Sequence, residues 1–268
     1  MTRNEIIELY LTSLNSEGSR NEYRKVVSKF VEAVDKELCD ITPLDCNAYV
    51  ATAYTCAATT RNTRVCVLKS FAKWLVANGV IEKDFAAGIK SLRAESEPKD
   101  RLTSEEVQRM YKLGNARERA IISLLLNTGL RVAEVTSLKV ADYNCEELRV
   151  KTKGSRYRTI YLSESTRADI DNYINTRKVD SDLLFASYGG KQITDHSLNA
   201  SWAKLARKAN INKHITNHSF RRLVVTEVAN EYGLAMAQKF IGHKNVATTA
   251  KYFQTDEEEI KNIYINRG

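Results

Sequence analysis

The residues with the clearest chemical potential lie in the C-terminal half of the chain. The segment IGHKNVATTAKYFQ, residues 241–254, places Tyr252 nine residues after His243. A free phenol has a pKa of about 10, so Tyr252 becomes a nucleophile only if its proton is removed or if nearby cations stabilise the phenolate. Taken alone, the segment favours an ordinary half-buried aromatic residue, so any evidence for a reactive tyrosine must come from the rest of the chain.

Two other segments carry cations in positions that suggest a shared target. In HSFRR, His218 and Arg221 are three residues apart, and on a helix such residues share one face. Arg131 follows the turn TGL and precedes the helical pattern VAEVTSL, where a cation opposes the helix macrodipole. Glu134, three residues further on, is expected to hold the Arg131 side chain. Each feature is also typical of a solvated surface or a simple Arg–Glu pair.

A basic turn lies between these two segments. The stretch LRVKTKGSRYRTIYL alternates apolar and polar residues, which predicts a β-hairpin around Gly154. Lys153 lies beside this glycine and is flanked by Lys151, Arg156 and Arg158. Such a turn either keeps the strands soluble or contacts a DNA groove, and the sequence leaves both readings open.

The order of these elements is more specific than any one of them. TGLRVAEV, a basic hairpin, HSFR, IGH and a tyrosine nine residues later resemble the tyrosine recombinase (phage integrase) family, whose pattern is Arg, Lys, His-x-x-Arg, His or Trp, and Tyr. The similarity runs from about residue 103 to residue 254. The helical N-terminal part, with YLTSL and LKSFAKWL, resembles the family's core-binding domain. This resemblance implies a compact, Xer-like or resolvase-like site-specific DNA recombinase.

The resemblance assigns a role to each matching residue. Arg131 and Arg221 would clamp the scissile phosphate, since each guanidinium can donate paired hydrogen bonds to phosphate oxygens. Tyr252 would be the nucleophile and Lys153 the general acid, although Lys151 remains an alternative. The remaining polar roles would fall to the two histidines, His218 and His243. Three nearby positions depart from the commoner form of the pattern without removing a catalytic group: Asn217, Phe220 and Arg222.

The same resemblance implies the course of the reaction and its partners. Attack on double-stranded DNA would give a 3′-phosphotyrosine intermediate and then a Holliday junction. The expected assembly is a homotetramer on two duplexes with inverted-repeat core sites, with or without an accessory DNA-bending or activating protein. The sequence lacks a carboxylate cluster suited to Mg²⁺, so we expect no metal and no cofactor.

Composition favours an intracellular DNA-binding protein. Of 268 residues, 43% are hydrophobic and 28% are charged, with a net charge of +8. Residues 1–96 carry 13 Lys and Arg against 12 Asp and Glu, whereas residues 97–268 carry 28 against 21. A basic excess of this kind suits a phosphate backbone. The five cysteines are scattered, and no signal peptide or apolar run of about 18 residues occurs, so we expect a cytoplasmic, nucleoid-associated protein.

The pattern of apolar residues predicts a mainly α fold with two domains. We expect a small all-helical, SAM-like core-binding domain over residues 1–96 and a polar linker over 97–102. Residues 103–268 are expected to form a mostly helical catalytic domain with a small antiparallel β-sheet and a C-terminal docking tail. Thr103 and Glu106 predict a capping box at its first helix. The apolar residues of the tail that would share one face are Ile260, Ile263 and Tyr264.

One N-terminal helix is expected to contact DNA. In TTRNTRVCVLKSFAKWLVANG, the residues Val65, Leu68 and Leu75 fall on one face, and Gly79 ends the helix. Four basic residues fall mostly off that face and are candidates for phosphate contacts, although a solvated face is an equal interpretation. They are Arg61, Arg64, Lys69 and Lys73.

Two other functions remain compatible with the sequence. A type IB topoisomerase resembles this family in its catalytic centre, and it would relax supercoils as a monomer without paired sites. A non-catalytic DNA-binding protein on the same fold would have no need for a nucleophile, so the presence of Tyr252 beside Arg131, His218 and Arg221 argues against it.

Overall fold

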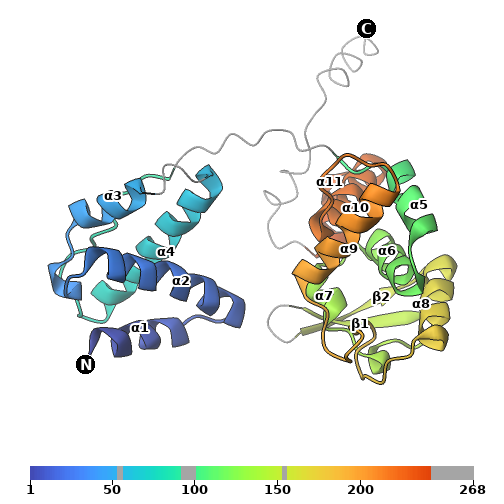
Figure 1. Cartoon of the computed structure of the whole chain (residues 1–268), viewed down its shortest axis with the longest axis horizontal. Coiled ribbons are helices and arrows are strands. Elements are labelled where there is room, and N and C mark those ends of the chain that lie inside the picture. Colours follow the sequence, from blue (N-terminus) through green and yellow to red (C-terminus); the bar gives the residue numbers. More distant parts are fainter. Residues whose placement is uncertain (53–56, 92–100, 153–155, 243–268) are drawn as a thin grey trace, which may run out of the picture. The chain divides into compact units, whose positions relative to one another are not determined.

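The computed structural model describes residues 1–52, 57–91, 101–152 and 156–242. The chain divides into two compact units, Met1–Pro98 and Lys99–Gly268, and each has a hydrophobic core of its own. Helices dominate both units, and the strands of the described residues form one two-stranded antiparallel sheet (Figure 1), as predicted. Within these ranges no helix is long and apolar enough to cross a membrane.

The first unit is all-helical in its described part. Its elements are α1 (Arg3–Thr12), α2 (Glu17–Val34), the 3₁₀ helix η1 (Leu38–Asp40), α3 (Pro43–Ala51) and α4 (Ala58–Ala77). Thr42 caps α3 and Pro43 occupies its first position, where the missing N–H of proline costs no hydrogen bond.

The core of this unit forms where α2 and α4 pack together. Phe30 of α2 and Leu68 and Phe71 of α4 are completely buried. The Tyr10 ring of α1 lies 5.0 Å from the Phe71 ring and 5.6 Å from that of Trp74, which fixes α1 against α4. The predicted apolar face of α4 is therefore confirmed.

The second unit contains most of the helices and the sheet. Its elements are α5 (Ser104–Leu113), α6 (Ala116–Thr128), α7 (Val132–Thr136), the 3₁₀ helix η2 (Val140–Asp142), β1 (Glu147–Thr152), β2 (Arg156–Tyr161), α8 (Glu164–Thr176), α9 (Asp195–Lys208), α10 (Asn217–Tyr232) and α11 (Leu234–Ile241). The predicted capping box of Thr103 and Glu106 opens α5.

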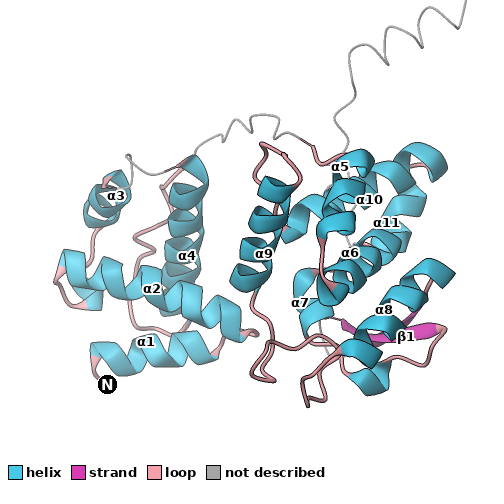
Figure 2. Cartoon of the chain, turned by 45° about the vertical axis from the view of Figure 1, so that its right-hand side comes forward, coloured by secondary structure: helices cyan, strands magenta, loops and turns pink. Residues whose placement is uncertain are grey.

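The β-hairpin has a fixed inward face. In the antiparallel register Leu148 faces Ile160 and Val150 faces Arg158. Leu148 and Val150 are fully buried, whereas Arg149 between them is exposed, as expected from the two-residue period of a strand. The hairpin lies against α7 (Figures 1 and 2). The strands confirm the predicted hairpin, and its tip, residues 153–155, lies outside the described residues.

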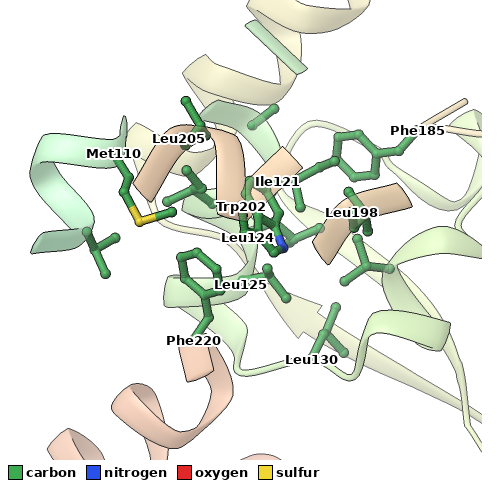
Figure 3. Close-up of a cluster of buried hydrophobic side chains, with 14 of the residues drawn as sticks. Met110, Ile121, Leu124, Leu125, Leu130, Phe185, Leu198, Trp202, Leu205 and Phe220 are labelled. Atoms are coloured by element: carbon green, nitrogen blue, oxygen red, sulfur yellow. The ribbon is translucent and has the colours of Figure 1, made fainter. Parts of the chain in front are cut away.

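The hydrophobic core of the second unit holds in place the helices that carry the candidate site. Figure 3 shows Trp202 of α9 and Phe220 of α10 beside Leu124 and Leu125 of α6. The rings of Trp202 and Phe220 meet edge to face at 5.2 Å, and both are fully buried. The aromatic ring at position 220 therefore fills core volume, and α10 is held in a fixed orientation against α6 and α9.

Candidate active site

The turn before Arg131 depends on a glycine. Gly129 ends α6 with φ of +58°, a left-handed conformation, and its N–H bonds the Leu125 carbonyl at 2.8 Å. The Thr128 hydroxyl bonds back to the Leu124 carbonyl at 2.6 Å. This closes α6 and leads directly to Arg131, which precedes α7.

Arg131 is held by the glutamate predicted for it. The Arg131 backbone N–H donates to Oε2 of Glu134 at 2.8 Å, and its Nη1 donates to Oε1 at 3.2 Å. The Glu134 side chain is buried, at 8% exposed, whereas that of Arg131 is 49% exposed. The carboxylate in the first turn of α7 offsets the unfavourable dipole interaction of Arg131 and leaves part of the guanidinium open to solvent.

Arg221 connects three segments that are far apart in the sequence. It is 3% exposed, and its Nη1 donates a short hydrogen bond to the Gly129 carbonyl. Its Nη2 donates to the Ile241 carbonyl at 3.2 Å. The side chain from α10 thus binds the turn that precedes Arg131 and the end of α11. The segments that carry the two predicted arginines converge.

The start of α10 is fixed by a buried amide. Asn217 accepts a hydrogen bond from Nε1 of Trp202 at 2.6 Å and donates one to Oδ1 of Asp195 at 2.9 Å. Its backbone N–H bonds Oδ1 of Asn199 at 2.9 Å. His218 follows in the first turn and is exposed. In the sequence Asn217 stands out only as a departure from the family pattern, because its contacts depend on how α9 and α10 pack.

The remaining predicted catalytic residues fall in segments that the structure does not describe. Lys153 lies in 153–155, and both His243 and Tyr252 lie in 243–268. The predicted apolar face of the C-terminal tail lies in the same segment. Gly242, directly before His243, ends the described part of the chain. The roles of these residues stay predictions.

The basic residues of α4 differ in their exposure. Lys73 is exposed, and Arg64 and Lys69 are partly exposed. Arg61 is buried, at 8% exposed, so its predicted place on the solvent face is wrong. The reason is helical geometry, because Arg61 lies four residues before Val65 and so falls on the same buried stripe.

On the hairpin Lys151 is exposed, and Arg156 faces Thr152 in the register.

Exposed cations of α2 lie near the basic residues of α4. Lys25 and Lys29 line an open depression of about 320 Å³ together with Tyr49, Arg64 and one acidic residue, Glu22. The Arg64 guanidinium lies 5.8 Å from the centre of the Tyr49 ring, within the range of a cation–π contact. We call Lys25, Lys29 and Arg64 the α2–α4 basic cluster. Sequence reasoning missed the two lysines because they lie on a different helix from the other candidates.

Gly129→Ala tests the turn at the centre of the site. A methyl group there would lie 3.3 Å from Val224 Cγ1 and from Ile241 Cγ2, and the positive φ disfavours alanine. We expect the free energy of unfolding to fall by about 1–3 kcal/mol. Urea denaturation measures the change. Gly189→Ala is the matched control, because a methyl group at Gly189 meets nothing within 4 Å. Equal stability of both variants would contradict this account of the turn.

Comparison with known proteins identifies the family. The model of the phage integrase family matches residues 100–259, and that of the phage integrase N-terminal SAM-like domain matches residues 7–79. The chain is 27% identical over 214 residues to tyrosine recombinase XerC of Vibrio cholerae, covering 75% of this chain and 69% of the relative. XerC of Serratia marcescens is 26% identical over 212 residues, covering 75% and 70%.

Solved structures share the fold. A λ integrase tetramer bound to a Holliday junction superposes with a TM-score of 0.77 at 17% identity, covering 95% of this chain and 78% of that one. XerA recombinase covers 99% of both chains with a TM-score of 0.56 at 24% identity. The chain belongs to the phage integrase family of tyrosine recombinases. Within that family it is a site-specific DNA recombinase, because the family match and the similarity to XerC both support this activity.

Proposed function

We propose that this recombinase cleaves and rejoins DNA through a 3′-phosphotyrosine intermediate, with Tyr252 as the nucleophile. The observation that carries the proposal is the convergence of three motif segments through Arg221, which bonds the Gly129 carbonyl before Arg131 and the Ile241 carbonyl before His243. Residues that are over 90 positions apart in the sequence thus meet at one place, as a phosphate clamp requires.

The clamp supplies positive charge where negative charge develops. Arg131 and Arg221 neutralise the phosphate, and His218 and His243 donate further hydrogen bonds around it. Tyr252 gives up its proton to solvent and attacks phosphorus as the phenolate, the bond to the 5′ oxygen breaks, and Lys153 transfers a proton to that leaving oxygen. The ester retains the bond energy, so the hydroxyl of a second strand can reverse the step. Since Arg221 is 3% exposed, its contact with DNA requires its surroundings to open locally.

The two domains have separate roles, one in DNA binding and the other in DNA cleavage. Residues 1–96 form the core-binding DNA domain, 97–102 the linker, and 103–268 the catalytic domain with its docking tail. The α2–α4 basic cluster, Lys69, Lys73, Lys151 and Arg156 contact the DNA backbone. Four copies act on two duplexes with inverted-repeat core sites. A λ integrase tetramer on a Holliday junction and XerH on a palindromic substrate provide the analogy. The protein acts on nucleoid DNA in the cytoplasm.

Covalent trapping from a mixture of DNA sequences tests the proposal and finds the recombination site in the same experiment. The purified protein is incubated with a library of nicked duplexes and with genomic fragments, and the DNA that remains bound after denaturation is sequenced. We expect adducts at the 3′ phosphate of inverted-repeat sites that flank a short spacer. Relaxation of supercoiled plasmid lacking any such site would instead indicate a type IB topoisomerase. Site-specific binding without any adduct would indicate a non-catalytic binding protein.

Lys29→Met tests the role of the α2–α4 basic cluster. Each phosphate contact contributes a slope of about −0.9 when the logarithm of the binding constant is plotted against that of salt concentration. Loss of Lys29 should therefore reduce the slope by about one, as measured by fluorescence anisotropy across a salt series. Arg24→Met is the matched control on the same helix, because Arg24 pairs with Glu8 at 2.7 Å. An unchanged slope for Lys29→Met would remove this helix from the DNA interface.

A further inference from the structure

An arginine lies on the core-facing side of the β-hairpin. Arg158 pairs with the fully buried Val150, so its side chain starts on the same face as Val150 and Leu148. Apolar residues are expected at such positions, and a guanidinium there must be compensated by a partner. The Arg158 side chain is 24% exposed, well below the 49% of Arg131.

Two elements of the site enclose this guanidinium. Its Nη2 lies 4.0 Å from Oε2 of Glu134, the carboxylate that also binds Arg131. Its Nη1 lies against Gly242, where an added methyl group would be only 2.8 Å away. Within the described part of the chain, the buried Nε and Nη2 of Arg158 have no hydrogen-bond partner at bonding distance. The ion pair with Glu134 is therefore the main compensation for its charge.

We propose that Arg158 is a positioning residue of the cleavage site. Glu134 lies between two arginines, and the inner one, Arg158, holds the carboxylate in the orientation that binds the outer one, Arg131. The same contact attaches the hairpin to the start of α7. This inference rests on the proposed function, because it assigns Arg158 a purpose only if Arg131 binds the scissile phosphate.

The contact with Gly242 extends the role to the next catalytic segment. Gly242 adopts φ of +66° and directly precedes His243 in the sequence. A side chain at Gly242 would be strained by the positive φ, and the end of the Arg158 side chain would have to move aside to admit it. The Arg158 guanidinium thus packs against the residue that directly precedes His243.

Single-turnover cleavage of a trapped site tests the proposal. Arg158→Met removes the guanidinium but keeps an apolar side chain on the inward face. We expect cleavage to fall by about 10- to 100-fold, as when a reacting group is misplaced by roughly 1 Å, with DNA affinity changed less than about threefold. Arg158→Lys retains a positive charge and should recover part of the rate. Rates are normalised to the folded fraction, measured by circular dichroism.

A double-mutant cycle separates positioning from direct contact with DNA. If Arg158 acts through Glu134, then Arg158→Met in a Glu134→Gln background should slow cleavage by less than about threefold beyond Glu134→Gln alone. If the two substitutions instead lowered the cleavage rate by independent factors that multiply, Arg158 would contact the phosphate itself. That result would overturn the positioning role. Arg149→Met is the matched control, since Arg149 is exposed on the same hairpin and stacks 4.4 Å from the centre of the Tyr157 ring.

The outcomes also distinguish this inference from the proposed function. An equal loss in Arg149→Met would assign the effect to the charge of the hairpin, and full activity of Arg158→Met would leave Arg158 without a role. Either result overturns the inference while the wild-type adduct still supports a recombinase. Absence of a wild-type adduct overturns the proposed function itself, and the inference falls with it.

Discussion

Replacing Tyr252 with phenylalanine is expected to abolish the covalent protein–DNA adduct and to lower strand cleavage by about 10⁴-fold or more. The change removes one oxygen and leaves the aromatic ring. Without that oxygen the phosphorus centre has no protein nucleophile. Removal of a nucleophile in an enzyme that uses a covalent intermediate costs rate factors of this order. A denaturing gel with a labelled nicked duplex measures the adduct directly.

A second tyrosine provides the control for this experiment. Tyr232 is 60% exposed near the end of α10, and Tyr232→Phe should form as much adduct as the wild type. Both variants should bind the labelled site with the affinity of the wild type, because the phenol hydroxyl contributes to the reaction rather than to recognition. If Tyr252→Phe still forms an adduct, the nucleophile is another residue, and mass spectrometry of the digested complex would identify it.

Sequence reasoning predicted the parts of this fold that depend on local signals. Thr103 and Glu106 cap α5, Gly129 ends α6, and the apolar stripe through Leu68 is buried, because caps, turn glycines and helical periodicity act within a few residues. The partner of Arg131 was also within local reach, since residues at i and i+3 of a helix meet.

Contacts between distant elements could not be predicted in this way. The bonds from Arg221 to the Gly129 and Ile241 carbonyls depend on how α10 packs against its neighbours. Burial of Arg61 was missed because its charge was given more weight than its place on the apolar stripe. Arg158 offered one signal that was overlooked, a charged residue at an inward position of an alternating strand.

Arg221→Lys is expected to lower strand cleavage by about 10²- to 10³-fold while DNA binding changes by less than about threefold. Lysine keeps the charge but cannot donate the paired, planar hydrogen bonds of a guanidinium. Once Arg221 has opened toward the phosphate, losing its donor to the developing charge is expected to cost about 3–4 kcal/mol. Cleavage is measured in single turnover on a nicked site, and binding by electrophoretic mobility at fixed salt.

The structural role of Arg221 must be separated from its role in the reaction. Arg221 also bonds two backbone carbonyls, and a carbonyl left unsatisfied costs about 1–3 kcal/mol of folding stability. Lysine retains donors for these carbonyls, so it is a better test than alanine. Arg222→Lys is the matched control, because it makes the same exchange at the neighbouring, less buried position of α10.

The loss of cleavage rate in Arg221→Lys, compared with its loss of DNA affinity, shows whether Arg221 acts in catalysis or only in binding. A phosphate contact made equally before and during the reaction lowers affinity and cleavage together, whereas one that strengthens at the transition state lowers cleavage alone. Equal losses of binding and cleavage in Arg221→Lys would therefore exclude a role for Arg221 in stabilising the transition state, even if Tyr252 proved to be the nucleophile.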